Sequence, residues 1–395
     1  MRIERILQRE LAAGLVGIHA KRLQLVFDAT CALVRSGKAT LTSIGRAIAV
    51  GTAHKHGIKR TDRLFGNRHL HAERVQIFAA IARRVVAPLS RPVVIIDWTD
   101  FSTTMWSLVA AVTFEGRAVT IYSETHPVSR YLKPAVHREF LERLRAVLPE
   151  GCVPIILTDA GFRSPWMREV LRLGWDYVCR LRGLNRLREN GRTSWSKLVQ
   201  LFERMGKGSR DFGTCELGLK ALFKTRVVGF SKRQRGPVWQ EKWGRLSRTN
   251  QHKQLRSARE PWILATSLNC SPNRIIALYR QRMQIEETFR DIKSTNLGFS
   301  MDHARTTCAA RADVLMLLAS LAHLMTIIAG FVAQAHALDR GFQANTVRTR
   351  RVLSIAKLGR LVLTHHGARR FSHAEVRSAW SCLAEQTFLS SFITN

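Results

Sequence analysis

The sequence has few acidic residues for its length. It contains 29 Asp and Glu against 63 Lys and Arg, a formal net charge of +34 over 395 residues. The excess runs along most of the chain and is not confined to one tail. A surface this positive attracts polyanions through its long-range field and through counterion release. The charge therefore favours nucleic acid as the partner, with an anionic membrane surface or a purely structural ribosomal RNA as the alternatives.

Closely spaced cysteines are also missing. No two of the seven cysteines lie within four residues of each other, which leaves no zinc knuckle and no redox pair. The odd count and irregular spacing fit reduced, mostly buried thiols, so we expect a cytoplasmic protein.

Long apolar runs are rare as well. The first residues, MRIERILQRELAAGL, interleave charges with apolar side chains and lack the continuous run of a signal peptide. Only residues 314–333 run for about 20 positions without a formal charge, long enough to cross a bilayer. A central helix buried on all sides has the same composition. We expect the buried helix and no membrane partner, because no second span exists and the rest of the chain is strongly basic.

The sequence pattern predicts two regions of different secondary structure. Residues 1 to about 85 repeat apolar side chains at helical spacing, with Gly37 as a stop. Residues 54–74 are basic, rich in histidine and interrupted by Gly57 and Gly66. Small helices with basic turns commonly present cations to DNA phosphates, which makes Lys59, Arg60 and Arg68 candidate DNA contacts. A solvated linker is the other interpretation.

From residue 91 the pattern becomes mixed α/β, with 46% apolar residues overall to supply a core. Buried strands are expected at 92–97, 153–159, 176–182 and 261–268, and a hairpin at 107–124 turning at Glu115-Gly116-Arg117. Amphipathic helices are expected at 135–148 and 165–174. This order predicts a mixed sheet flanked by helices. The polar, basic stretch 183–258 reads either as an inserted, mainly β subdomain or as a long loop.

Two of the predicted apolar strands end in an aspartate. Asp97 ends PVVIID and Asp159 ends VPIILTD. If the two strands are parallel neighbours, both carboxylates lie at the edge where open α/β sheets place their sites. Adjacent carboxylates repel each other and so favour capture of a hard cation such as magnesium. Alternatively each aspartate simply starts a turn.

A single long helix is predicted for residues 271–294, with Ser271-Pro272 as its start. At about 100° per residue, Tyr279, Arg282, Glu286 and Lys293 fall within an arc of about 60°. An apolar stripe of Leu278, Ile285, Phe289 and Ile292 would dock this helix on the sheet. An exposed Arg–Glu pair of little energetic value is the simpler reading of that spacing.

The three carboxylates together suggest a specific chemistry. Displacement at a phosphodiester needs metal ions on the attacking and leaving oxygens, and two ions about 4 Å apart suit it. Asp97, Asp159 and Glu286 can supply the ligands for two Mg²⁺ ions, with Mn²⁺ as a substitute. Arg282 and Lys293 would grip the flanking phosphates.

The pattern Tyr279, Arg282, Glu286, Lys293 resembles the Tyr-Arg-Glu-Lys signature of bacterial insertion-sequence transposases of family four. The segments NRHLHAER, DAGF, RQRMQIEETFRDIKS, EPWILAT and FQANTVR are similar to the insertion-sequence-ten branch. The resemblance spans nearly the whole chain. It implies an RNase H-like catalytic domain with an Asp-Asp-Glu triad, matched here by Asp97, Asp159 and Glu286.

The resemblance also implies a separate role for each part of the chain. Residues 1–88 would bind the terminal inverted repeats, 89–325 would form the catalytic domain with 183–258 inserted, and 326–395 would contact DNA or mediate dimerisation. Members cut and paste their element through a DNA hairpin within a homodimeric synaptic complex, and then join it to target DNA. Trp262 matches a tryptophan that holds a flipped-out base, although a tryptophan in a strand is more often core.

Two other functions stay open at this stage. A catalytically inactive, transposase-derived DNA-binding protein would keep the same composition and signature. A membrane-associated basic protein built on residues 314–333 is the third possibility, and simple fractionation would separate it from the first two.

Overall fold

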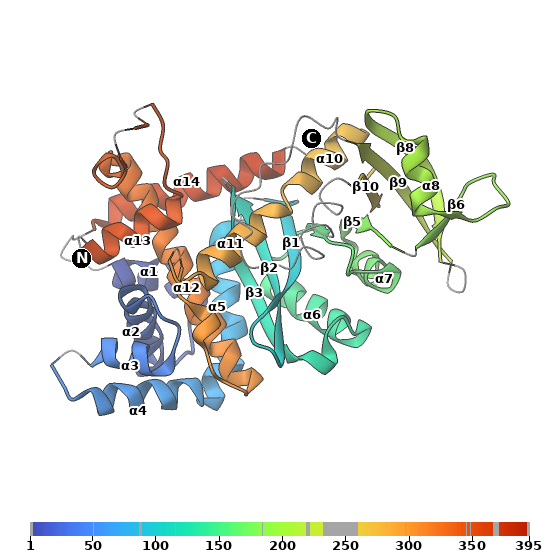
Figure 1. The fold of residues 1–395 in the computed structure, drawn as a ribbon. Helices are drawn as coiled ribbons and strands as arrows, with labels where there is room; N and C mark the ends of the chain where they lie inside the picture. The colour runs from blue at the N-terminus through green and yellow to red at the C-terminus, as the bar shows by residue number, and fades with distance from the viewer. Residues whose placement is uncertain are drawn as a thin grey trace, which may run out of the picture. The chain divides into compact units, whose positions relative to one another are not determined.

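The computed structural model describes residues 3–392 except 50, 87–88, 115, 184, 219–221, 232–259, 297, 345, 348 and 366–370. The chain forms two compact units. The first comprises Met1–Pro154 with Gln281–Phe392, and the second is built from Ile155–Arg280. Each unit is described by itself below, with labels as in Figure 1.

The first unit opens with five α-helices, drawn in blue in Figure 1: α1 (Ile3–Leu11), α2 (Ala20–Ser36), α3 (Leu41–Ile48), α4 (His54–Phe65) and α5 (Arg68–Val86). Gly37 ends α2 in the left-handed conformation, with φ of 62°, as the predicted stop requires. Thr40 caps α3, because its side-chain oxygen accepts a hydrogen bond from the backbone N–H of Ser43 at 3.2 Å. The helical N-terminal part is therefore as predicted.

Helix α4 corrects one detail of that prediction. Gly57 does not interrupt the basic segment, because α4 runs through it from His54 to Phe65 and ends at Gly66. Gly57 faces Gly45 of α3, and a Cβ atom on either glycine would collide with the backbone of the facing helix. The two glycines allow α3 and α4 to pack backbone against backbone, which offsets the helix-weakening effect of glycine.

The sheet of the first unit follows. Strands β1 (Val93–Asp100), β2 (Met105–Phe114) and β3 (Arg117–Pro127) are antiparallel and lie in the order β3-β2-β1. Gly116, with φ of 77°, lies in the short hairpin connection, while Glu115 of the predicted turn falls outside the described residues. Helix α6 (Pro134–Val147) follows and packs against β3 and α5.

The second unit contains seven strands among its described residues. They are β4 (Ile155–Thr158), β5 (Asp176–Leu181), β6 (Arg186–Glu189), β7 (Ser196–Lys197), β8 (Gly208–Leu217), β9 (Phe223–Ser231) and β10 (Trp262–Thr266), in the order β4-β5-β10-β9-β8-β6-β7. Strands β4 and β5 are parallel, and each later neighbouring pair in this order, from β5–β10 to β6–β7, is antiparallel, so the sheet is mixed as predicted. Its helices are α7 (Ser164–Arg172), α8 (Leu198–Arg204) and α10 (Pro272–Arg280).

The stretch predicted as an inserted β subdomain is mainly β where it is described. Strands β6 to β9 and the short helix α8 lie within it. Residues 232–259 of the same stretch lie outside the described residues.

The long apolar segment forms α12 (Ala309–Ala335) in the first unit. It is long and apolar enough to cross a membrane, yet its most apolar window is entirely buried inside the protein. It contacts α2, α5, α14 (His373–Phe392), β3 and α13 (Ile355–His365) (Figure 1). Within it, the Ser320 hydroxyl donates to a backbone carbonyl one turn earlier at 2.8 Å. The segment is thus the central helix of the core, as expected.

Candidate active site

The predicted long helix is two helices. Helix α10 ends at Arg280, and α11 (Met283–Lys293) begins after a turn at Gln281 and Arg282. At this turn the backbone N–H of Gln284 bonds to the carbonyl of Gln281 at 2.9 Å, a three-residue connection in place of the α-helical one. Buried Gln281 accepts a hydrogen bond from the Thr113 hydroxyl at 2.7 Å. The single arc of four signature residues is therefore wrong, because Tyr279 lies on the preceding helix.

Helix α11 is docked on the β2–β3 hairpin by polar as well as apolar contacts. Ile285 and Ile292 of the predicted stripe are buried, while Phe289 is only half-buried. Between them, the Thr288 hydroxyl donates to the carbonyl of Ala118 at 3.0 Å and accepts from its N–H at 2.8 Å. These two bonds tie the helix to one residue of β3 and so fix its rotation.

An ion-pair network completes the docking of α11. Asp291 accepts a hydrogen bond from the Arg117 guanidinium of β3 at 2.6 Å, and His323 of α12 lies 3.7 Å away. Burial opposes ionisation of the Asp291 carboxyl, but these two partners hold its pKa below the usual value. These contacts hold α11 against both β3 and α12 and so fix the backbone position of Glu286.

Asp97 is one of the carboxylates that face this helix. It does not end its strand, as the sequence suggested, because β1 continues to Asp100 and Asp97 pairs with Val109 in mid-strand. Beyond Asp97 the strand keeps pairing with β2 as far as Asp100, and the side chains of Trp98 and Thr99 are buried. Asp97 accepts a hydrogen bond from the backbone N–H of Trp98 at 2.9 Å.

Arg282 joins Asp97 to Glu286. Its Nη1 atom lies 3.0 Å from Asp97 Oδ2, and its Nη2 atom contacts Glu286 Oε1. The side chains of Asp97 and Arg282 are 13% and 12% exposed, whereas that of Glu286 is 43% exposed. Two carboxylates from elements far apart in the sequence therefore converge on one cationic group. Carboxylate oxygens gathered in this way are the donor set that a hard divalent cation prefers.

Lys293 lies at the other end of α11. Its ammonium pairs with Asp100 Oδ1 at 2.5 Å, and Asp100 is itself mostly exposed. The two signature cations are thus both neutralised by carboxylates of β1, one near its middle and one at its end. The phosphate-gripping role predicted for Arg282 and Lys293 would require them to exchange these partners for DNA.

Asp159 belongs to the second unit. It follows the last residue of β4, is half-buried, and accepts a hydrogen bond from the backbone N–H of Gly161 at 2.9 Å. This is the turn-starting role that the sequence left open. Among the described residues, no group of three or more His, Cys, Asp or Glu side chains is placed to hold a metal ion. Joint action of Asp159 with Asp97 and Glu286 stays a prediction.

Trp262 and Tyr279 form an aromatic cluster in the second unit. The Trp262 ring lies 5.1 Å from the Tyr279 ring in an edge-to-face arrangement and 5.7 Å from the Phe230 ring. Tyr279 is buried, whereas Trp262 is only half-buried and so is not a simple core residue. The Arg280 guanidinium lies over Phe230 at 5.0 Å.

The three candidate DNA contacts in the basic segment are exposed. Lys59 and Arg60 lie on α4, and Arg68 begins α5. Across the part of the chain that the structure describes, none of the three side chains has a hydrogen bond or an ion pair. They form an accessible basic surface on the N-terminal helices.

Sequence reasoning missed a buried polar network beside β1. The Trp98 indole donates to Nε2 of His137 at 3.1 Å, and burial lowers the pKa of His137 to about 4, so this imidazole is neutral. Nearby Glu124 binds His126 at 3.1 Å and Arg143 at 2.8 Å. These hydrogen bonds outweigh burial and lower the pKa of Glu124 to about 2. The consecutive polar residues 122–126 of β3, in a strand that is otherwise largely apolar, were the available signal.

Comparison with known proteins identifies the fold. Residues 88–324, more than half of the chain, match the family model described as "Transposase DDE domain". The chain belongs to the DDE transposase family. Its mixed α/β architecture is consistent with the RNase H-like fold of these transposases, whose members generally use divalent metal ions and act on DNA. No curated protein matches the chain.

Proposed function

We propose that this DDE transposase moves an insertion sequence of family four, closest to the insertion-sequence-ten branch, by a cut-and-paste reaction. The observation that carries the proposal is the convergence of Asp97 and Glu286 on one guanidinium. Two elements nearly two hundred residues apart deliver their carboxylates to one point, and the hairpin contacts of α11 hold one of them there. A purely structural helix face needs no such arrangement.

Asp97, Glu286 and Asp159 would hold two Mg²⁺ ions, for which Mn²⁺ could substitute. Bound ions supply an activated oxygen nucleophile and stabilise the leaving oxygen of the phosphodiester. The half-buried setting of Asp97 limits competition from water, and its bond from the Trp98 N–H orients the carboxylate. Neutral His137 fixes the Trp98 ring and so acts as a positioning residue for the neighbouring Asp97.

DNA contacts would come from several parts of the chain. Lys59, Arg60 and Arg68, which have no side-chain partner among the described residues, provide cations for phosphates of the terminal inverted repeats. Arg282 and Lys293 would grip phosphates near the cut after leaving their carboxylates. Half-exposed Trp262, backed by Phe230 and Tyr279, offers a ring on which a flipped-out base can stack. We propose that a homodimer assembles the two ends in the bacterial cytoplasm, with residues 1–88, 89–325 and 326–395 as the functional parts.

The test is cleavage of linear DNA carrying the element's own terminal repeat, in magnesium or manganese. The wild type should cut flush and leave a hairpin, which is then opened for transfer to target DNA. Glu286→Gln and Asp159→Ala should bind this DNA and leave it uncut. Glu287→Gln is the matched control, since it removes the same charge from the next residue of α11 and should cut normally.

The outcomes separate the two candidate functions. Cutting by Glu286→Gln or Asp159→Ala would remove that carboxylate from the active site. Binding by the wild type without cutting in either metal would instead establish the catalytically inactive, transposase-derived DNA-binding protein.

A further inference from the structure

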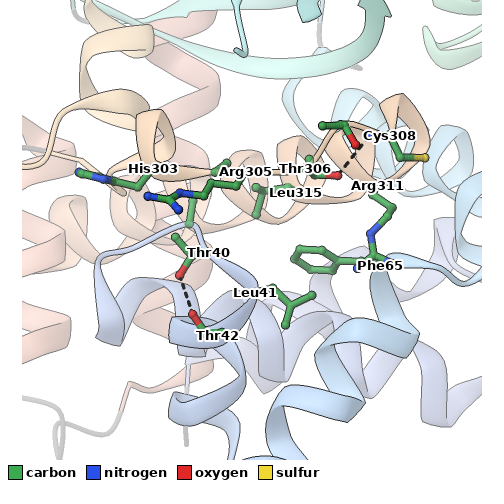
Figure 2. Close-up of a pocket in the computed structure, with 13 residues that line it drawn as sticks. Thr40, Leu41, Thr42, Phe65, His303, Arg305, Thr306, Cys308, Arg311 and Leu315 are labelled. Carbon is green, nitrogen blue, oxygen red and sulfur yellow. Dashed lines mark hydrogen bonds between the residues drawn. The ribbon is translucent and has the colours of Figure 1, made fainter. Parts of the chain in front are cut away.

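A cavity that none of the three predicted carboxylates lines lies within the first unit. Its volume is about 600 Å³, and it opens between the start of α3, the end of α4 and the segment 303–315 that leads into α12 (Figure 2). This is within the usual size range of small-molecule sites. None of the sequence motifs pointed to it, because its walls come from segments more than two hundred residues apart.

Both apolar and basic side chains line this cavity. Leu41, Phe65 and Leu315 contribute apolar side chains, and Figure 2 shows the first two facing the 303–315 segment from the N-terminal helices. Phe65 and Leu315 are buried, whereas Leu41 is half-buried. A flat apolar group of nucleobase size would find van der Waals contact here on more than one side.

The remaining part of the lining includes basic side chains. Exposed His303 and Arg305 line the cavity, and neither side chain has a hydrogen bond or ion pair among the described residues. Arg311 also lines it, lying over the Phe65 ring at 5.9 Å while it pairs with Asp62 at 2.6 Å. The Arg305 guanidinium beside apolar side chains is complementary to a nucleotide, which joins an anionic phosphate to a flat ring.

We propose that this cavity binds one unstacked nucleotide of a single DNA strand, with its base against Leu41 and Leu315 and its phosphate on Arg305. The inference rests on DNA being the substrate, as proposed above. A base within a duplex exposes only its edges to the grooves, and its faces are covered by stacking. Apolar walls therefore contribute only when the base has left the stack, as at a frayed or nicked end.

The experiment uses the full chain and three fluorescent probes: a short oligothymidylate, a chain of abasic residues of equal length, and a blunt duplex. Thr42→Trp adds bulk at the cavity without changing charge, and Arg305→Gln removes a cation from the cavity wall. Arg145→Gln is the matched control, since Arg145 is exposed, unpaired among the described residues, and not part of the cavity wall.

Thr42→Trp should weaken oligothymidylate binding about tenfold and leave the abasic chain and the duplex unchanged. Arg305→Gln should weaken both single-stranded probes about tenfold, while Arg145→Gln should have little effect. Unchanged oligothymidylate binding by Thr42→Trp, or equal losses with Arg305→Gln and Arg145→Gln, would overturn the assignment. Failure of the wild type to bind any probe would count against the proposed function instead.

A second measurement needs no variant. Cys308 is exposed and lines the cavity, so its alkylation reports occupancy directly. Oligothymidylate should slow modification of Cys308 more strongly than the abasic chain does. Equal protection by both probes would show that no base enters, and absence of protection would show that the strand binds elsewhere. If Thr42→Trp lowers the melting temperature, protection of Cys308 in the wild-type protein tests whether a base enters the cavity.

Discussion

Replacing Arg282 by glutamine should destabilise the protein without metal and much less in its presence. The side chain neutralises Asp97 and Glu286 at once. The Asp97 pair is mostly shielded from water, and removing one partner of a buried pair costs about 3–5 kcal/mol. The Glu286 pair is partly exposed, which limits it to about 0.2–1 kcal/mol. Because Asp97 keeps some access to water, we expect a total of about 3 kcal/mol.

Thermal unfolding followed by fluorescence measures this effect. A loss of about 3 kcal/mol corresponds to a fall of roughly 6 °C in melting temperature for a domain of this size. In millimolar Mn²⁺ the difference between wild type and variant should shrink by about half or more, because a cation that binds the folded state replaces the missing positive charge. A calorimetric Mn²⁺ titration should likewise give tighter binding to the variant, which has no guanidinium to displace.

The control is Arg290→Gln, on the same helix. Arg290 is 60% exposed and pairs only with Glu287 among the described residues, so its loss should change the melting temperature little in either condition. An Arg282→Gln difference that is the same with and without Mn²⁺ would refute the reasoning. It would mean that no cation enters between Asp97 and Glu286.

Three further predictions follow from the structure. Since the folded-state pKa of His137 is about 4, against 6.5 for the free side chain, the unfolded chain gains a proton first. Stability should fall by about 3 kcal/mol between pH 6.5 and 4, and denaturant unfolding of His137→Gln should lack this decline. Gly57→Ala should lower the melting temperature by several degrees, whereas Gly341→Ala, which adds a Cβ in open space, should not. Equal melting temperatures for the two variants would refute the close packing of α3 and α4. Trp262→Ala should slow hairpin formation about tenfold while leaving first-strand nicking intact, and parallel losses in gel assays would remove its base-holding role.

Local patterns in the sequence determined the elements well. The apolar, β-branched runs gave β1, β4, β5 and β10 to within a few residues, and helical spacing gave α6 and α7. The turn at Asp159 was one of two alternatives that the local pattern allowed, and composition alone did not separate the burial of α12 from a membrane span. Such patterns succeed because strand and helix periodicity record which side of an element faces the core.

Contacts between distant segments could not be read from the sequence. At the break before α11, Gln281 accepts a hydrogen bond from Thr113 of β2, and helical periodicity carries no trace of that bond. The same holds for the extension of β1 beyond Asp97.

Arg282 shows most clearly which contacts the sequence could not predict. Its spacing to Glu286 was visible in the sequence, but its bond to Asp97 joins residues 185 positions apart. The sequence by itself determined which residue types were available and which elements carry them. Only the tertiary structure decided that Arg282 lies between two carboxylates, and that His303 and Arg305 flank an apolar cavity, because packing of remote segments sets both arrangements.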